Sequence, residues 1–287
     1  MVFYSVEDFL VFFTIFSVVA RKLDVWILGI CIMPDHIHVS IGCRYRWDVS
    51  DFVQEYTSRF SKEFNKDSER KGPLFKKAFG SATKQGDKSI RTNFSYVYNN
   101  GREKKLCDRT DRYQWNFMAY AQSDHPFSEK LQMNRLSRRM KYAIKTIDAL
   151  YEDDQPLKYD TLRKIFRGVS PREKKQITDY IITKYNCIDY DTLISFYGTY
   201  DNMLLAFESN QGSEYDIKEI YEGKSDVAYR DITLALLNIH KFKRAKDAIA
   251  LPTDVKVNLK QDLLYETPAT PRQIEKYLHL QRITNDG

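Results

Sequence analysis

The sequence predicts an α+β protein, with an antiparallel β-sheet and helices in its first part and a mainly helical second part. Near residue 25 a continuous apolar run is followed directly by a segment in which apolar and polar residues alternate, which is typical of adjacent strands. After about residue 121 the apolar residues instead recur at helical spacing, behind a linker-like QSDHP segment. We therefore expect one domain at 1–121, a linker at 122–129 and a helical domain at 130–287.

The composition narrows the classes of function. With 287 residues, of which 43% are hydrophobic, the chain can build a real core, and general disorder is excluded. A formal net charge of +6 permits a nucleic-acid partner without requiring one, and the 20 tyrosines offer rings on which unpaired bases could stack. The four cysteines form no CxxC pair, which argues against a disulfide scaffold or a structural zinc site and favours a reduced, cytoplasmic setting.

The first expected element is a buried helix rather than a membrane or export segment. The apolar run FLVFFTIFSVVA at 9–20 is too short to span a bilayer comfortably. Ser5 and Asp8 have the spacing of a capping box, and the basic residues Arg21 and Lys22 follow the run, as suits a helix dipole. A signal peptide would have its basic residues before the apolar run.

Two strands are expected next, at 25–33 and 36–42, on either side of a Pro-Asp break. In the second strand, alternate side chains share a face, so His36, His38 and Ser40 point to one side of the sheet. Two neighbouring imidazoles on one face can chelate a divalent metal. Taken alone, this pattern favours a surface pair of histidines that binds no metal over a metal site.

The remaining elements of the first part are a helix, a strand and a second helix. The helix is expected to have Ser50 as its N-cap and to bury one apolar stripe, and a further strand is expected at 74–84. The second helix is expected at 88–100, with Gly101 at its C-terminus. The stripe consists of Phe52, Tyr56, Phe60 and Phe64.

The expected helix at 88–100 carries a second chemical signal. Tyr96 and Asn100 are four residues apart and share a face, whereas Tyr98 lies about 200° round the helix from Tyr96. If this helix packs on the sheet, it could bring Tyr96 to the histidines, and Asn100 could supply a neutral oxygen ligand. The alternative is that Tyr96 is only a half-buried packing residue.

Four segments resemble, in order and spacing, the single-tyrosine HUH transposases, a family that includes the REP-associated and the IS200-like transposases. The resemblance covers roughly residues 5–121, and the combination of a metal strand with a tyrosine helix is what makes it specific. The segments are MPDHIHVSI at 33–41, GPLFKKAF at 72–79, the Tyr-x-x-x-Asn of 96–100 and YQWNF at 113–117.

The resemblance implies both a fold and a chemistry. His36, His38 and Asn100 would bind Mg²⁺ or Mn²⁺, and Tyr96 would be the nucleophile that cuts and rejoins single-stranded, hairpin-associated DNA through a 5′-phosphotyrosine, as in DNA transposition. The family fold is a ferredoxin-like sheet with helices, the HUH nuclease domain. Its first strand would be short or missing here, because only Met1 to Tyr4 precede the first helix. Relatives act as monomers or as dimers, so a homodimer is an open alternative.

Two regions are further candidates for contact with DNA. A set of basic residues could line the DNA path, or could simply form a solvated basic face. Near 256–282, two short helices separated by a TPATP turn could form a helix-turn-helix, or a plain helical hairpin. The basic residues are Lys76, Lys77, Lys84, Lys88 and Arg91.

Two rival functions stay open at this level. The first is a DNA-binding relative that has kept the fold and lost the activity, which the short N-terminus would favour. The second is a metal-dependent nuclease that uses water while Tyr96 is structural. We rank the nuclease last, because no cluster of carboxylates accompanies the two histidines in the sequence, as two-metal nucleases require.

Overall fold

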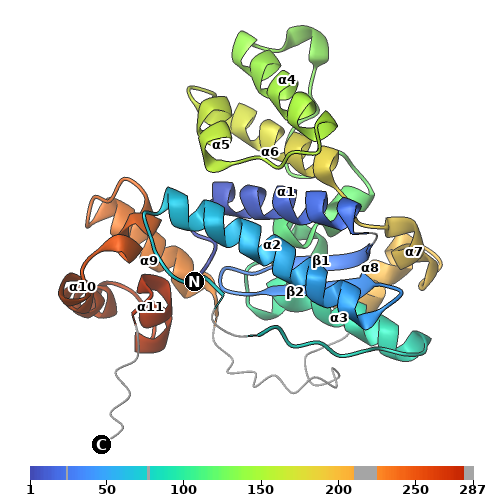
Figure 1. Cartoon of the computed structure of the whole chain (residues 1–287), viewed down its shortest axis with the longest axis horizontal. Coiled ribbons are helices and arrows are strands. Elements are labelled where there is room, and N and C mark those ends of the chain that lie inside the picture. Colours follow the sequence, from blue (N-terminus) through green and yellow to red (C-terminus); the bar gives the residue numbers. More distant parts are fainter. Residues whose placement is uncertain (24, 76–77, 210–224, 281–287) are drawn as a thin grey trace, which may run out of the picture.

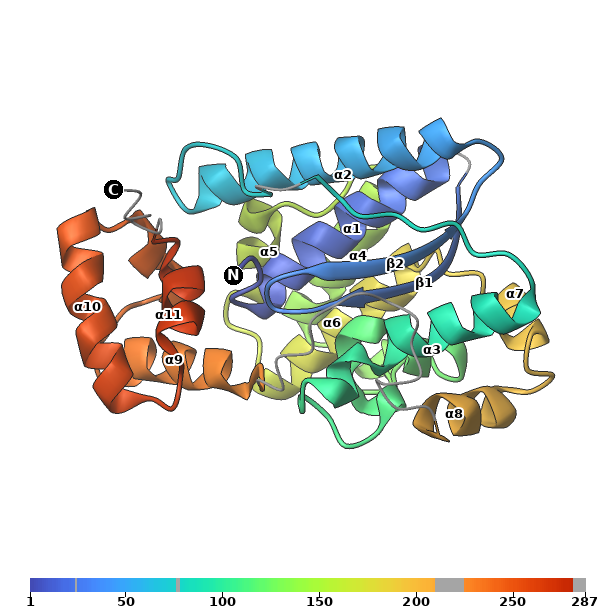
Figure 2. The same ribbon diagram turned by 90° about the horizontal axis from the view of Figure 1, so that it is seen from below.

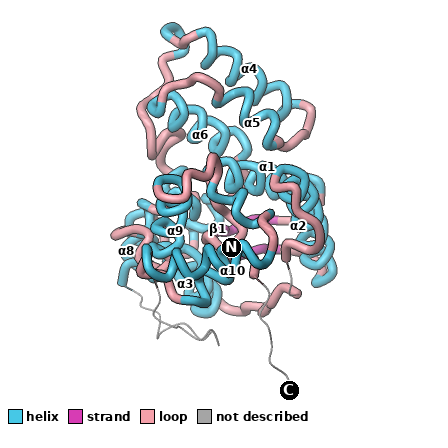
Figure 3. The backbone as a smooth tube through the Cα atoms, turned by 90° about the vertical axis from the view of Figure 1, so that its left-hand side faces the viewer, coloured by secondary structure: helices cyan, strands magenta, loops and turns pink. Residues whose placement is uncertain are grey.

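A two-stranded sheet between layers of helices forms the centre of the computed structural model, which describes residues 1–23, 25–75, 78–209 and 225–280 (Figure 1). Strands β1 (Trp26–Ile32) and β2 (Ile37–Gly42) pair antiparallel, as predicted, with Cys31 opposite His38. Helices α1 (Val6–Lys22) and α2 (Arg46–Asp67) cover one face of the sheet, and α3 (Asp87–Glu103) covers the other. Figure 3 shows how small the β-structure is beside the helices.

Apolar and polar residues alternate along β2, so successive side chains point to opposite faces of the sheet and contact different layers of helices. Ile37, Val39 and Ile41 pack against the main core under α1 and α2. The ring of His38 instead meets Tyr96 of α3, and the Ser40 hydroxyl donates to Asn93 Oδ1 of α3 at 3.0 Å. The period-two pattern therefore predicts correctly which face of the strand carries the histidines.

The predicted strand at 74–84 is wrong for the residues that can be described. Residues 74–75 and 78–84 form no strand, and residues 78–83 are exposed, so this stretch has no core to pack on. Residues 1–4 also form no strand, although the Val2 and Phe3 amides both donate to the Pro34 carbonyl at 2.9 Å. The ferredoxin-like sheet is therefore not confirmed, because the sheet of the described residues has two strands.

Helix α1 is the predicted buried helix. The Ser5–Asp8 capping box is present, and the side chains from Phe9 to Ala20 are buried. Aromatic rings of α2 cover one side of α1; Phe60, for example, lies edge-on to Phe12, with centroids 5.2 Å apart. Among the helices of the described residues, none is both long and apolar enough to cross a membrane.

The predicted starts and ends of α2 and α3 need correction. The N-cap of α2 is Tyr45 instead of Ser50, because the Asp48 carboxylate accepts from the Tyr45 amide and the helix begins about one turn earlier, at Arg46. Helix α3 continues past Gly101 to Glu103. A Cβ at Gly101 would lie only 2.6 Å from Cγ of Tyr113, so this glycine permits close packing and does not end the helix. The apolar stripe of α2 is buried as predicted.

The helices after residue 130 pack in three groups around the central unit (Figures 1 and 2). The first group lies on the outer side of α1, the second beside β1 and α3, and the third beside the N-terminal segment. The first group is α4 (Arg138–Glu152), α5 (Tyr159–Phe166) and α6 (Pro171–Tyr185); the second is α7 (Tyr190–Ser195) and α8 (Tyr200–Ser209); the third is α9 (Val227–Asn238), α10 (Thr253–Glu266) and α11 (Pro271–Leu278).

The predicted division at 122–129 and the predicted helix-turn-helix stay predictions. The segment 122–129 contacts α6, since the Phe127 amide donates to Asp179 Oδ2 at 3.0 Å. Thr270 caps α11 through a capping box, with Pro271 at the first helical position as expected. Residues 281–282 of the predicted motif lie outside the described residues.

A buried group of charges ties the third group of helices to α1 and α2. The Lys246 ammonium lies in the short 3-10 helix η6 (Ala245–Ala250) before α10. It is 2.8 Å from Asp8 Oδ1 of α1 and 2.5 Å from Asp67 Oδ2 at the end of α2. The Tyr159 hydroxyl of α5 donates to the same Asp8 oxygen at 2.7 Å. Lys246 thus pairs with two buried carboxylates from different helices, and Asp67 also pairs with Arg163 and Arg244.

Candidate functional site

Two histidine rings lie side by side where β2 begins. His36 stands directly before the strand, and His38 lies within it. Their ring centroids are 4.7 Å apart and their planes are nearly perpendicular, at 88°. The i, i+2 relation of a strand thus gives the predicted juxtaposition.

His38 is the buried member of the pair. Its Nε2 atom is shielded from solvent and has no hydrogen-bond partner among the described residues. Burial, followed by the neighbouring His36 ring, lowers the pKa of His38 to about 3, while a hydrogen bond with the Asn100 side chain acts in the opposite direction. The ring is therefore neutral at physiological pH, which is the form of imidazole that binds metals.

Tyr96 and Asn100 reach the histidines from α3. The ring of Tyr96 lies 4.9 Å from that of His38, at 80°, and its residue is 8% exposed. The buried Asn100 amide donates to the Tyr96 carbonyl at 2.7 Å. Tyr98 lies on another side of the helix: its hydroxyl donates to the Leu28 carbonyl, and its ring stacks on Phe207. The structure therefore brings together the four residues singled out for metal binding and nucleophilic attack.

Asp35 is a neighbour of the site that the sequence indicates only as part of the Pro-Asp turn between the two strands. Its Oδ1 lies 2.5 Å from His36 Nδ1, and its Oδ2 contacts Lys276 of α11 and Tyr229 of α9. Burial would raise the pKa of this carboxyl, but the hydrogen bond with His36 and the charge of Lys276 outweigh it and hold the pKa well below its usual range. Its place next to His36 was visible in the sequence, whereas its two distant partners were not.

These residues fit a divalent metal ion by their donor chemistry. His38 offers a buried, unpaired imidazole nitrogen, and His36 keeps Nε2 available while Nδ1 faces Asp35. The Asn100 amide lies against the same ring. Within the described ranges, no three His, Cys, Asp or Glu side chains form a metal cluster, and Asn100, a residue of another type, is the candidate third ligand.

Of the five basic residues predicted to line the DNA path, the structure describes Lys84, Lys88 and Arg91. Lys88 and Arg91 are exposed on the first two turns of α3, and Lys84 is half-buried just before it. The Asn93–Ser40 hydrogen bond puts this end of α3 beside the far half of β2, away from His36. Lys76 and Lys77 lie outside the described residues. Their roles in DNA binding stay predictions.

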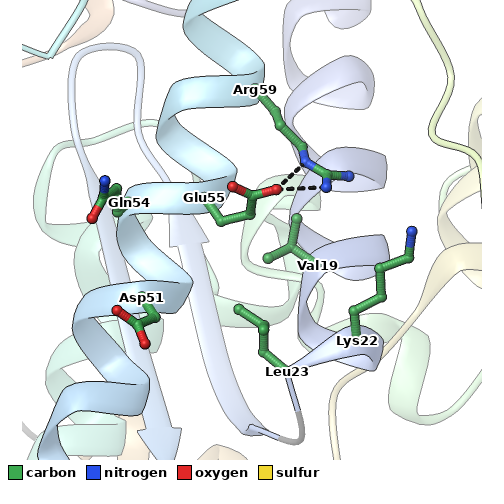
Figure 4. Close-up of a pocket in the computed structure, with 7 residues that line it drawn as sticks. All are labelled: Val19, Lys22, Leu23, Asp51, Gln54, Glu55 and Arg59. Atoms are coloured by element: carbon green, nitrogen blue, oxygen red, sulfur yellow. Dashed lines mark hydrogen bonds and ion pairs between the residues drawn. The ribbon is translucent and has the colours of Figure 1, made fainter.

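A surface hollow between α1 and α2 is unrelated to this site. Figure 4 shows the Glu55–Arg59 ion pair of α2 above Val19 and Leu23, in a hollow that contains no residue of the candidate site. Its location on the opposite side of the sheet from α3 excludes it as the cleft that serves Tyr96.

Comparison with known families adds an independent observation. The model of the family described as "Transposase IS200 like" matches residues 6–100. Residues 6–100 are thus similar to the IS200-like transposase family. The family suggested by the sequence motifs is thereby confirmed.

The IS200-like transposase segment extends from α1 to Asn100, so it contains His36, His38 and Tyr96 and ends at the predicted third ligand. It spans about a third of the chain, and the helices after α3 lie outside it. No curated protein and no solved structure matches the chain. The similarity of this segment to the family suggests a transposase function and DNA as the partner.

Proposed function

We propose that this chain cuts and rejoins single-stranded DNA through a covalent 5′-phosphotyrosine on Tyr96, with a divalent metal held by His36, His38 and Asn100. The observation that carries the proposal is the approach of the Tyr96 ring to the buried, neutral His38 ring, at 4.9 Å. A hydroxyl nucleophile and a candidate metal ligand thus lie in contact inside an IS200-like transposase segment.

The proposed reaction needs no external energy source, because one phosphoester bond forms for each one that breaks. The Tyr96 hydroxyl gives up its proton and its oxygen attacks the scissile phosphorus, the bond from phosphorus to the 3′ oxygen breaks, and the departing oxygen takes up a proton as a 3′-hydroxyl. The new phosphotyrosine ester keeps the bond energy, so a second 3′-hydroxyl can attack it, release Tyr96 and join two strands. Mg²⁺ or Mn²⁺, when bound, supplies polarisation of a phosphate oxygen and offsets its developing charge.

A pair of exposed aromatic rings supports single-stranded DNA as the substrate. Tyr45 and Trp47 stack on each other, with centroids 4.6 Å apart and planes 9° apart, and they are 54% and 62% exposed. Arg44 and Arg46, also exposed, flank them. Unpaired bases stack on such rings while arginines contact phosphates. The pair follows β2, at the end of the strand away from His36.

The second candidate function is a DNA-binding relative that does not cut. Two observations favour it: the described sheet has two strands where the family fold has more, and Tyr96 is 8% exposed. A nucleophile so deeply placed needs a local opening before a phosphate can reach it. The water-using nuclease has less support, because the described residues contain no carboxylate-rich metal cluster.

Incubation with single-stranded DNA hairpins and Mn²⁺ tests the proposal. A DNA–protein adduct that survives denaturing electrophoresis and disappears when the metal is chelated is the expected result. Hairpin binding without an adduct would assign the chain to the non-cutting alternative. Metal-dependent cleavage without an adduct would point to the nuclease.

A further inference from the structure

The turn that precedes the two histidines is held by helices from the far end of the chain. Asp35 Oδ2 accepts from the Tyr229 hydroxyl of α9 at 3.3 Å and forms an ion pair with the Lys276 ammonium of α11. Both helices lie outside the segment that matches the transposase family. Figures 1 and 2 show this group of helices beside the end of the sheet where β1 turns into β2.

The other oxygen of the same carboxylate faces the metal-site histidine. Asp35 Oδ1 lies 2.5 Å from His36 Nδ1, and the Asp35 side chain is only 7% exposed. Tyr229 and Lys276 both donate to this carboxylate, which has no proton of its own to donate. In the hydrogen bond with His36 the imidazole is therefore the donor, and its proton lies on Nδ1. Nε2 of His36 is then left with its lone pair for a metal. Metal-binding histidines are commonly oriented in this way by a carboxylate behind them.

The backbone of the turn is anchored by the same helix through the N-terminal segment. The Val2 and Phe3 amides donate to the Pro34 carbonyl, directly before Asp35. This segment is itself bonded to α11: the Tyr4 hydroxyl donates to the Tyr277 carbonyl at 2.6 Å, and the Met1 amino group donates to the Lys276 carbonyl at 2.6 Å. Helix α11 thus contacts the turn through a side chain and, indirectly, through the backbone.

We propose that α9 and α11 position His36 for metal binding through Asp35, with Lys276 and Tyr229 as positioning residues. This role rests on the proposed function, since it presumes a metal at His36 and His38. It gives the C-terminal helices a part in the chemistry that is separate from any contact with DNA. Loss of such outer partners costs metal sites roughly 10- to 100-fold in affinity.

The test is Mn²⁺ affinity of the full-length protein, measured by electron paramagnetic resonance without DNA. Asp35→Asn should weaken binding by roughly 10- to 100-fold, and Lys276→Met and Tyr229→Phe by smaller factors. Lys276→Arg, which retains the charge, should restore affinity. The matched control is Lys260→Met, which removes the 2.5 Å ion pair of α10 with Glu275 of α11 and does not touch Asp35.

The outcomes separate this inference from the function on which it rests. If the wild type binds no Mn²⁺, the proposed metal site fails and the positioning role fails with it. If the wild type binds Mn²⁺ and the Asp35, Lys276 and Tyr229 variants bind equally well, only the positioning role is overturned. A loss shared equally by Lys260→Met would also overturn it, because the effect would then be general destabilisation of α11. Circular dichroism melting of each variant is the check that its fold is retained.

Discussion

The ring of Tyr96 lies edge-on to the ring of His38, with centroids 4.9 Å apart and planes at 80°. This contact joins a helix to a strand that are 58 positions apart in the chain, counting from 38 to 96. The contact favours Tyr96 as the reactive tyrosine, because the hydroxyl of Tyr98 on the same helix donates to the Leu28 carbonyl on β1 instead.

Replacement of Tyr96 by Phe should abolish the covalent adduct and leave binding of DNA and metal in place. The substitution removes one oxygen and almost no packing volume, so the fold should survive. Tyr98→Phe, the matched control, loses the hydrogen bond to Leu28 at a cost of about 1 kcal/mol in stability and should still form the adduct. Denaturing electrophoresis of labelled DNA reads out both variants. An adduct with Tyr96→Phe but none with Tyr98→Phe would assign the nucleophile to Tyr98.

Trp47→Ala should weaken binding of single-stranded DNA by about 5- to 150-fold, which corresponds to about 1–3 kcal/mol per stacked base. Binding of duplex DNA should change much less, because paired bases cannot stack on the ring. The control is Tyr142→Ala, since Tyr142 is 53% exposed on α4, outside the regions that are candidates for contact with DNA. Fluorescence anisotropy with an oligonucleotide measures both. Equal affinities of the two variants for single-stranded DNA would contradict the stacking role.

Lys246→Met should destabilise the protein by about 3–5 kcal/mol, because it leaves the buried Asp8 carboxylate without its ammonium partner, whereas Asp67 keeps its ion pairs with Arg163 and Arg244. Urea denaturation followed by circular dichroism measures the loss. Lys158→Met is the matched control: its ammonium is exposed and lies 4.0 Å from Glu63, so about 0–1 kcal/mol is expected. A small effect at Lys246 would mean that water or rearrangement compensates the Asp8 carboxylate.

The acid sensitivity of the fold should depend on His279. Burial, followed by the charge of the N-terminal amino group, lowers the pKa of His279 from 6.5 to about 3. Between these two values the unfolded chain binds a proton that the folded chain excludes, so stability falls as the pH drops from about 6.5 towards 3. His279→Asn should make this fall shallower, by at most about 1.4 kcal/mol per pH unit.

Asparagine is the suitable replacement because residue 279 has a left-handed backbone, with φ of 54°. The slope of unfolding free energy against pH, from urea titrations at several pH values, is the measurement. His38, whose pKa is lowered to a similar value, should leave part of the slope in place. Identical slopes in the wild type and the variant would exclude His279 as a contributor.

The sequence by itself determined the local elements and the chemistry they carry. The capping box of Ser5 and Asp8, the apolar stripe of α2 and the alternation of β2 are short-range patterns, and each one forms as predicted. Period two in a strand and a spacing of four in a helix place His36 with His38 and Tyr96 with Asn100, whatever the rest of the fold does. The motif order was likewise sufficient to identify the family.

Only the tertiary structure decided what surrounds these elements. Residues 78–83 lack a buried face, so the expected strand there does not form, and Gly101 packs beneath Tyr113 instead of ending a helix. The partners of Asp35 are Tyr229 and Lys276, which lie 194 and 241 positions further along the chain. No local sequence pattern predicts such contacts, because they depend on how helices that are distant in the chain pack against one another. In our proposal, this packing orients His36 through Asp35.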